Sequence, residues 1–307
     1  MTLISVVIPT YNYAHFLGEA IDSILNQSYA DWECIIIDDG STDDTKEKVN
    51  EYIKSDPRIK YFFQTNGGLS SARNKGIELA KGNWIQLLDA DDTIDKTKFT
   101  LQLALFELNA SIDIVTGNYL LMCADGQTLK SHGSTRARFI DKPLTEFISN
   151  WENGFSIPIH SFLFRKTCFE KWGNFDKRLK THEDLSLHLK FAFHGAFYLY
   201  HPELVAYYRI HNASMARNYT NMFQGYLQAL KYFVNENKPP FGVKVQVQHR
   251  YFLEIARMVS FKIMRKNISV VVALQPFGFS LLNITAFLLS PFYICRKIFF
   301  KLIGRRG

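Results

Sequence analysis

The sequence predicts an α/β protein in which a mostly parallel sheet is covered by helices on both faces. Short apolar runs rich in Ile and Val alternate with segments that have helical spacing. The apolar runs are residues 3–9, 32–38, 59–64 and 84–89, and the helical segments between them are residues 15–28, 41–55 and 69–82. Strands that are apolar along their whole length are typical of a parallel sheet buried on both faces.

Local signals justify these elements in chain order. Pro9 ends the first strand, and the helix that follows has apolar residues every three or four positions. Ser41 or Thr42 can cap the second helix, whose first turn is acidic. Gly82 is placed to end the third helix before the fourth apolar run.

From about Ile112 the pattern changes to shorter, mixed segments. We expect strands at 111–122 and 158–166, two strands or a turn-containing pair at 196–211, and helices at 143–150, 183–195, 222–237 and 244–266. Lys238-Pro239-Pro240 separates the last two helices. The chain contains no internal repeat.

The C-terminal part is basic and contains a long uncharged run. The net charge is +7, and residues 241–307 hold eleven Lys or Arg against one acid, Glu254, which gives +10 there and −3 before it. Residues 268–295 carry no charge, and Pro276, Gly278 and Pro291 interrupt helix geometry in this run. Apolar length between basic clusters favours an anionic membrane surface over nucleic acid as the partner of 268–307. The alternative is a helix pair packed on the rest of the protein.

The cysteines and the N-terminus indicate a cytoplasmic location. Cys34, Cys123, Cys168 and Cys295 are far apart and lack metal-type or redox-type spacing, so we expect no disulfide. The N-terminus lacks the basic start and long apolar stretch of a signal peptide. We therefore expect a protein on the cytoplasmic side, peripheral or monotopic on the inner face of the cell membrane.

The stretch "GNWIQLLDADDTID", residues 82–95, places four carboxylates directly after an apolar run. Asp89, Asp91 and Asp92 can chelate a hard divalent cation, and Mn²⁺ or Mg²⁺ suits such a site when a diphosphate completes the shell. The alternative is a helix cap, for which one aspartate would be enough.

Polar clusters follow each of the first four strands. They are Thr10-Tyr11-Asn12, Asp38-Asp39-Gly40, Asn66-Gly67-Gly68 and Asp89–Asp92. Because ligands bind at the carboxyl ends of parallel strands, we expect all four to face one crevice. The second cluster is also typical of a tight turn with a helix cap. No G-x-G-x-x-G follows the first strand, which argues against a dehydrogenase.

Five motifs together resemble the family 2 glycosyltransferases, which have a GT-A fold. They are "SVVIPTYN", "SILNQSYADWECIIIDDGSTDDT", "NGGLSSARNKGIELAKG", "WIQLLDADD" and "HEDLSLHLKFAFHG", and they cover roughly residues 3–212. The resemblance implies a nucleoside diphosphate sugar donor and a single displacement step that inverts the anomeric centre.

The resemblance also implies roles for individual residues. The nucleotide-sugar set is Pro9, Thr10, Tyr11, Asn12, Asp38, Asp39, Asn66, Arg73, Asp89, Ala90 and Arg209, and the metal set is Asp91, Asp89, Asp92 and His211. Asp184 would be the general base and Glu183 would orient it, although acids also favour a helix N-terminus for structural reasons. We interpret His160 and His182 as structural residues.

These expectations divide the chain into three parts. Residues 1–215 form the GT-A catalytic domain, with a nucleotide-sugar half at 1–111 and an acceptor half at 112–215. Residues 216–267 are a helical region, and residues 268–307 are a membrane-associating tail. We expect a hexosyl- or N-acetylhexosaminyltransferase that uses a divalent cation and acts on a lipid-linked saccharide in polysaccharide biosynthesis.

Two other functions fit part of the pattern. A nucleotidyltransferase also uses paired aspartates, but "PTYNYAHF" lacks the glycine- and lysine-rich loop that binds a triphosphate. A membrane-attached protein that binds sugar nucleotides without turnover would not need both Asp91 and Asp184.

Overall fold

The structure is a computed structural model that describes residues 3–129, 142–151, 157–212, 214–215 and 218–266. The strands are β1 (Ile4–Thr10), β2 (Trp32–Asp38), β3 (Ile59–Phe63), β4 (Trp84–Leu87), β5 (Thr93–Ile94), β6 (Ile114–Cys123), β7 (Thr128–Leu129), β8 (Phe162–Arg165) and β9 (Tyr198–Ile210). The helices are α1 (Ala14–Leu25), α2 (Thr45–Ser55), α3 (Leu69–Leu79), α4 (Lys98–Leu108), α5 (Pro143–Asn150), the 3₁₀ turn η1 (Ile159–Ser161), α6 (Lys166–Trp172), α7 (Glu183–Phe193), α8 (Tyr219–Asn237) and α9 (Phe241–Lys266).

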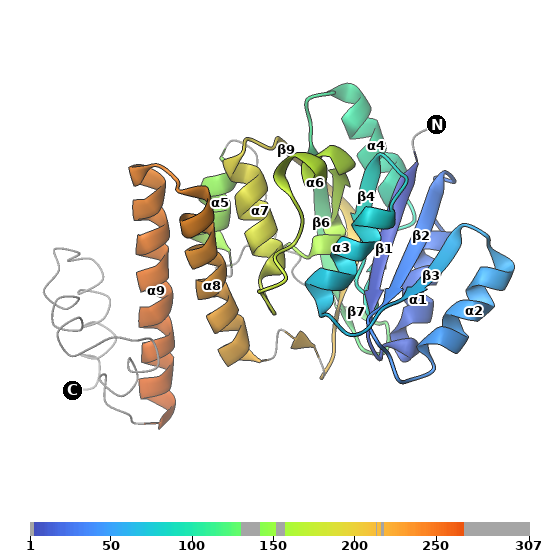
Figure 1. Ribbon diagram of the computed structural model, residues 1–307, viewed down its shortest axis with the longest axis horizontal. Helices are drawn as coiled ribbons and strands as arrows, with labels where there is room; N and C mark the ends of the chain where they lie inside the picture. The colour runs from blue at the N-terminus through green and yellow to red at the C-terminus, as the bar shows by residue number, and fades with distance from the viewer. Residues whose placement is uncertain (1–2, 130–141, 152–156, 213, 216–217, 267–307) are drawn as a thin grey trace, which may run out of the picture. The chain divides into compact units, whose positions relative to one another are not determined.

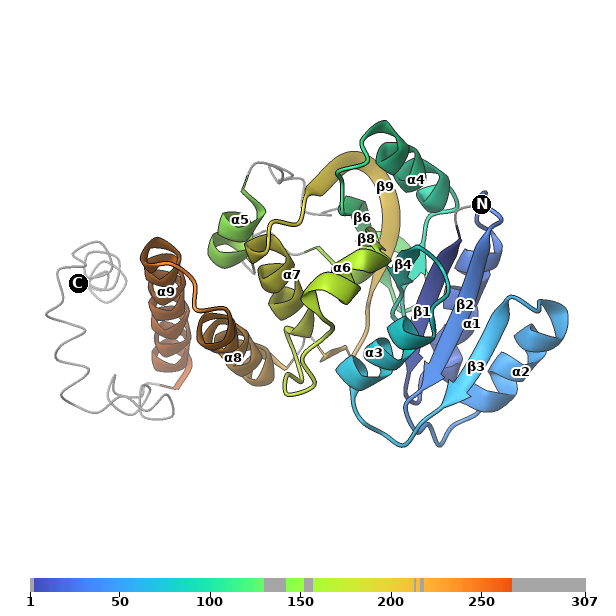
Figure 2. The ribbon, with the colours of Figure 1, turned by 45° about the horizontal axis from the view of Figure 1, so that its top comes forward.

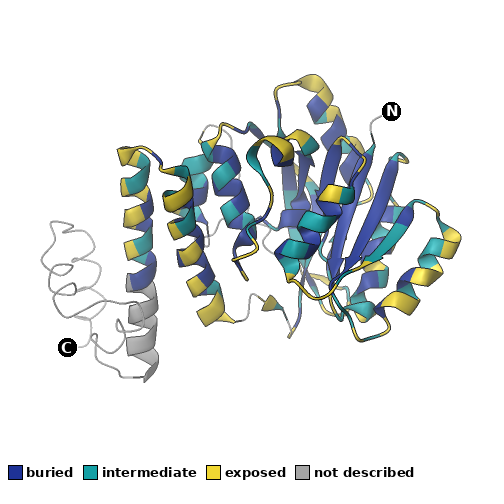
Figure 3. Ribbon diagram, in the orientation of Figure 1, coloured by how far each residue is buried: buried dark blue, intermediate teal, exposed yellow. Residues whose placement is uncertain are grey.

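The first half of the sheet is parallel, as the sequence predicts. The strand order is β3-β2-β1-β4, and Val6 pairs with Cys34 of β2 on one side and Gln86 of β4 on the other. All seven residues of β1 and of β2 are buried, which Figure 3 shows as continuous dark blue strands. The prediction that the strands are covered on both faces is therefore confirmed for β1, β2 and β4, whereas the edge strand β3 is partly exposed.

The second half of the sheet is mixed, so the prediction of a mostly parallel sheet is too simple. The order continues β8-β6-β9-β5, and four of the eight pairings between described strands are antiparallel. β8 runs antiparallel to both of its neighbours, β4 and β6. Sequence spacing does not reveal this reversal, because β8 is too short to show a pattern of its own.

Residues 198–210 form one strand rather than two. β9 pairs in parallel with β6, and its register shifts where Thr116 is opposite Tyr200 and Asn118 is opposite Leu204. The residues between those two partners include Pro202, which cannot donate to a ladder and is tolerated at such a bulge. Helices α4 and α6 are not among the helices expected from the sequence.

Helix α3 and helix α1 lie on opposite faces of the sheet (Figures 1 and 2). Ile4, Val6 and Ile8 of β1 point into a core cluster that includes the buried residues of α1. Val7 points to the other face, where a Cβ atom added to Gly76 of α3 would lie 2.2 Å from its Cγ1. Glycine at position 76 therefore lets α3 pack closely on β1, and Arg73 lies one turn earlier in the same helix.

Arg73 of α3 joins the two halves of the sheet domain. Its side chain is 2% exposed, and its Nη2 donates to Asp89 Oδ1 and its Nη1 to Glu183 Oε1, both at 2.6 Å. Burial alone would lower the pKa of Arg73, but Asp89 and Glu183 outweigh burial and raise it. The guanidinium is therefore charged, and it binds the acidic loop after β4 to the first turn of α7.

The described chain separates into two compact units, which divide after Lys238. Helix α8 belongs to the first unit and α9 to the second. Among the described helices, none combines the length and the hydropathy needed to cross a bilayer. The predicted membrane-associating tail, residues 268–307, lies outside the described residues.

Replacing Arg73 with Met is expected to lower the free energy of unfolding by about 3–5 kcal/mol, because it leaves Glu183 buried without its cation. Arg178 is a matched control, since it also pairs with two carboxylates, Asp176 and Glu236, but its side chain is 53% exposed. Arg178→Met should cost less than about 1 kcal/mol. Denaturant titration of both variants measures the difference, and equal losses would show that Arg73 does not act as a buried connection.

Candidate active site

Asp39 fixes the start of α3. Its carboxylate accepts hydrogen bonds from Gln64 Nε2 at 2.6 Å, Gly67 N at 2.8 Å and Gly68 N at 2.7 Å. Gly68 caps the helix with φ +86°, a conformation that favours glycine. In this structure, Asp39 therefore links the end of β2 to the helix that carries Arg73.

Asp38 is buried on the other face of β2. It accepts hydrogen bonds from Ser41 N and Tyr61 Oη, both at 2.7 Å. Both partners are groups of the protein itself, so Asp38 shapes the turn after β2. These contacts agree with the interpretation of Asp38 as a residue of a tight turn. Its neighbour Asp39 instead binds the start of α3.

The predicted nucleotide residues after β1 differ in exposure. Pro9 and Thr10 are buried, and Thr10 Oγ1 has no hydrogen-bond partner among the described residues. Tyr11 is 47% exposed, and Asn66, which follows β3, is also exposed. Asn12, at φ 57°, donates its amide to Ser41 Oγ and accepts from Thr42 N. The ends of β1 and β2 are thereby tied together beside an exposed aromatic ring.

Arg209 binds the acidic loop, residues 89–92, through its backbone amide and its side chain. Its backbone amide donates to Asp92 Oδ1 and its Nε to the Asp91 carbonyl, both at 2.7 Å. Its Nη2 lies 2.5 Å from Glu19 Oε2, and its side chain is 0% exposed. The resemblance placed Arg209 among the nucleotide-sugar residues, whereas the structure shows its guanidinium directed at protein groups.

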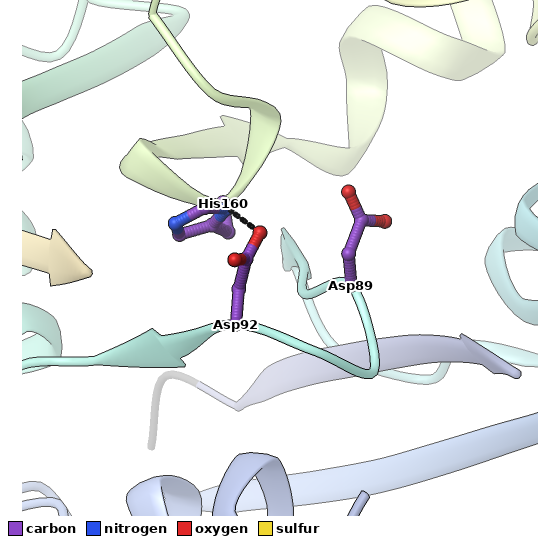
Figure 4. Close-up of side chains that lie close together, drawn as sticks. All are labelled: Asp89, Asp92 and His160. Atoms are coloured by element: carbon purple, nitrogen blue, oxygen red, sulfur yellow. Dashed lines mark ion pairs between the residues drawn. The ribbon is translucent and has the colours of Figure 1, made fainter. Parts of the chain in front are cut away.

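His211 and His160 lie on either side of the same loop. His211 Nε2 is 2.9 Å from Asp91 Oδ2. His160 Nδ1 is 3.0 Å from Asp92 Oδ2, and both side chains are almost fully buried. Figure 4 shows His160 and Asp92 side by side, with Asp89 one turn of the loop away.

The loop residues can hold a divalent cation. One ligand atom from each of Asp89, Asp92 and His160 lies within 4.8 Å of the others. The pair of Asp91 and His211 offers a second carboxylate–imidazole set beside it. Carboxylate oxygens suit Mn²⁺ and Mg²⁺, and an imidazole beside them favours the transition metal Mn²⁺ over Mg²⁺. Sequence reasoning gave His160 a structural role, and only the approach of η1 to the loop, a tertiary contact, brings it into this group.

Burial and neighbouring negative charge act together on the pKa of Asp91. The pKa of Asp91 rises to about 6 because of burial first and then the charges of Asp92 and Asp89, while the hydrogen bond from His211 opposes the rise. The same acids, after burial, raise the pKa of Tyr13 to about 12. A cluster this strongly negative favours a cation among its oxygens.

Asp184 stands in the first turn of α7, beside Glu183. Burial, followed by the charge of Glu183, raises the pKa of Asp184 to about 6, and the charge of His182 opposes the rise. Its Oδ1 accepts the amide of Leu185 at 2.7 Å. A carboxyl group with a pKa near 6 is suited to accept a proton at neutral pH.

Tyr208 shows that Asp184 and the acidic loop share one environment. Burial and then the charges of four acids, Asp92, Asp91, Asp89 and Asp184, raise the pKa of its hydroxyl. Arg73 connects the same two segments through Asp89 and Glu183. Of the predicted residues, the structure thus brings the acidic loop, Arg73, His211 and the Glu183-Asp184 pair together. The side chains of Asp38, Asp39 and Arg209 bind protein groups.

The sequence has relatives among named glycosyltransferases. It is 35% identical over 190 residues to the uncharacterized glycosyltransferase EpsJ of Bacillus subtilis, a match that covers 61% of this chain and 55% of EpsJ. It is 32% identical over 218 residues to TuaG of the same organism, a glycosyltransferase provisionally named for teichuronic acid biosynthesis, covering 70% of this chain and 82% of TuaG. The chain spans about half the length of the first curated relatives it matches.

Two solved structures share the fold at low sequence identity. Staphylococcus aureus TarS, residues 1–349 in complex with UDP-GlcNAc, superposes with a TM-score of 0.66 at 18% identity over 90% of this chain and 80% of that one. The mannosyltransferase PcManGT of Pyrobaculum calidifontis, in complex with GDP-Man and Mn²⁺, gives 0.60 at 16% identity over 98% and 84%. These likenesses support the GT-A fold.

The family model for glycosyl transferase family 2 matches residues 5–173, more than half of the chain. The matched segment contains the four strand-end clusters and the acidic loop and ends before Asp184. This match and the extent of the TuaG alignment agree with the geometry of the site: the chain belongs to glycosyl transferase family 2.

Proposed function

We propose that the protein is an inverting glycosyltransferase that moves a sugar from a nucleoside diphosphate sugar to a hydroxyl group of a saccharide. The observation that carries the proposal is the pair of 2.6 Å contacts from Arg73, which bind the acidic loop to the segment of Asp184. A transferase needs both segments together, because one binds the leaving diphosphate and the other accepts the proton of the attacking hydroxyl.

The donor is a nucleoside diphosphate sugar, held by the ends of β1 to β4. Tyr11 offers an exposed ring to the base, and Thr10 Oγ1 offers a hydrogen bond that the described residues leave unmade. The TarS and PcManGT complexes, which contain UDP-GlcNAc and GDP-Man, support this class of donor. Asp39, Asn66 and Asp89 would border the same ligand.

A divalent cation, Mn²⁺ or Mg²⁺, belongs to Asp91 and His211, with Asp89 and Asp92 beside them. When bound, such a cation neutralises negative charge on the leaving diphosphate. The Mn²⁺ in the PcManGT complex, the 2.9 Å contact of Asp91 with His211 and the neighbouring group of Asp89, Asp92 and His160 support a cation in this loop. Arg209 acts from behind, as a buried cation that keeps the loop in place.

Asp184 is the general base. The acceptor oxygen forms its bond to the anomeric carbon while the bond from that carbon to the diphosphate oxygen breaks, and the hydroxyl proton passes to the Asp184 carboxylate. Attack from the side opposite the leaving group inverts the anomeric centre. Glu183, fixed by Arg73, keeps the first turn of α7 in position for this step.

The acceptor is a lipid-linked saccharide in the synthesis of a cell-surface polysaccharide, on the inner face of the cell membrane. The name of TuaG refers to teichuronic acid biosynthesis, which supports a role in polysaccharide synthesis. The tail at 268–307 consists of an uncharged run, residues 268–295, followed by basic residues. It would attach the protein to the anionic membrane surface where such an acceptor lies.

Replacing Asp184 with Asn is expected to lower kcat by about 10²–10⁴-fold and to leave donor binding within about twofold, because only proton transfer is lost. Release of UDP or GDP from a panel of UDP-GlcNAc, UDP-glucose and GDP-mannose with Mn²⁺ measures turnover, and calorimetry measures binding. Asp125→Asn, in the exposed turn between β6 and β7, is the control. An Asp184→Asn protein as active as the parent would remove the assigned base. In a separate assay, release of pyrophosphate from a nucleoside triphosphate and a sugar 1-phosphate would indicate a nucleotidyltransferase.

The turnover of the parent should depend on pH with an acidic limb near 6. Asp184 must be ionised to accept a proton, and burial has moved its pKa from 3.8 to about 6, so kcat/KM should fall tenfold per pH unit below 6 and level off above it. The pH profile is measured with saturating Mn²⁺. A limb near pH 4 would contradict the raised pKa, and the residual rate of Asp184→Asn should lack the limb.

A further inference from the structure

Asp184 is preceded by two buried residues whose placement depends on α8. Thr181 is 5% exposed and His182 is 4% exposed. His182 adopts the left-handed conformation, with φ 58° and ψ 24°, and its carbonyl accepts the amide of Ser186 to start α7. A residue other than glycine adopts the left-handed conformation at a cost in free energy, so surrounding contacts must stabilise this turn.

Three residues of α8, Asn221, Gly225 and Tyr226, contact this turn. Thr181 Oγ1 donates to the carbonyl of Asn221 at 3.2 Å. The His182 ring lies edge-on to Tyr226, with centroids 5.4 Å apart and planes at 81°. Between them is Gly225, where an added Cβ would lie 1.8 Å from Thr181 Oγ1 and 2.9 Å from the Thr181 carbonyl oxygen. Only glycine at 225 allows α8 to approach the turn this closely.

The first turn of α7 is therefore fixed from two sides. On one side Arg73 binds Glu183. On the other side α8 contacts Thr181 and His182, directly before it in the chain. Asp184 stands next to both attachments, and its Oδ1 accepts a local hydrogen bond from Leu185 N. The segment matched by the family model ends at residue 173, before α7 and α8.

We propose that Gly225 and Tyr226 of α8 are positioning residues for the general base, acting through Thr181 and His182. This inference rests on the proposed role of Asp184. A displacement of about 1 Å in a reacting group can cost about 10²-fold in rate, so a shift of the turn should reduce turnover without a loss of donor affinity. Residues outside the strand-end site thus complete it.

The test compares Gly225→Ala with Thr181→Ala and with the double variant. Gly225→Ala should lower kcat of donor hydrolysis by about 30- to 100-fold, with KM for the donor within about twofold, because its Cβ displaces Thr181. The double variant removes the hydroxyl oxygen that the new Cβ meets and should recover about tenfold of that loss. Gly242→Ala, at a glycine of α9 with no atom within 4 Å of the added Cβ, should change kcat by less than twofold.

Thr181→Ala keeps the proposal testable if Gly225→Ala does not fold. It should lower kcat by about three- to tenfold at constant KM, and amide hydrogen exchange at 182–186 should become faster. A parent-like kcat in Thr181→Ala and in folded Gly225→Ala would overturn the proposal, as would a Gly225→Ala loss that the double variant does not reduce. If the parent turns over none of the donors, the proposed function fails, and the exchange measurement alone decides whether α8 holds the turn.

Discussion

The arrangement of the site depends on one buried cation. Arg73 reaches two carboxylates that are 94 residues apart in the chain, and both contacts measure 2.6 Å. Its own position is set by α3, which starts where Asp39 accepts the amides of Gly67 and Gly68 and which packs on β1 at Gly76. Because a buried guanidinium without both partners would be costly, this single group keeps the loop and the base segment at a fixed separation.

The positive charge of Arg73 offsets part of the negative charge of the site. Four acids raise the pKa of Tyr208, and two of them, Asp91 and Asp184, have pKa values raised to about 6. Arg73 neutralises part of this charge from α3 and Arg209 from β9, where its side chain is fully buried. A cation bound at Asp91 and His211, as proposed above, would relieve the repulsion among the carboxylates of the loop.

The sequence was sufficient for the parallel half of the fold and insufficient for the rest. β1 to β4 are apolar runs separated by helical segments, so spacing along the chain defines them. The predicted cap at Ser41 or Thr42 is wrong, because α2 begins at Thr45 with Asp44 as its N-cap. β8 has four residues and β9 bends at Pro202, so neither shows a complete pattern. α4 follows a two-residue strand without a clear boundary, and its residues are apolar on more than one face. β8 and β9 are defined by their pairing with other strands, which spacing along the chain does not encode.

The candidate site shows the same limit at the level of side chains. The strand-end rule located Asp89, Asp91 and Asp39 because chain order alone brings those residues to one edge of the sheet. The strand-end rule could not tell that the protein uses Asp38 internally, and the family resemblance could not tell this for Arg209. The strand-end rule also gave no reason to link His160 to the acidic loop, because η1 reaches Asp92 only through the antiparallel pairing of β8.

The most direct test of the account is a crystal structure of the protein with UDP and Mn²⁺, with the metal located by its anomalous signal. The account predicts one Mn²⁺ bound to Asp91 and to the diphosphate, with Arg73 still joining Asp89 to Glu183 and the Asp184 carboxylate facing the β-phosphate. UDP bound on a surface that the Asp184 carboxylate does not face, or Arg73 released from either carboxylate, would contradict it.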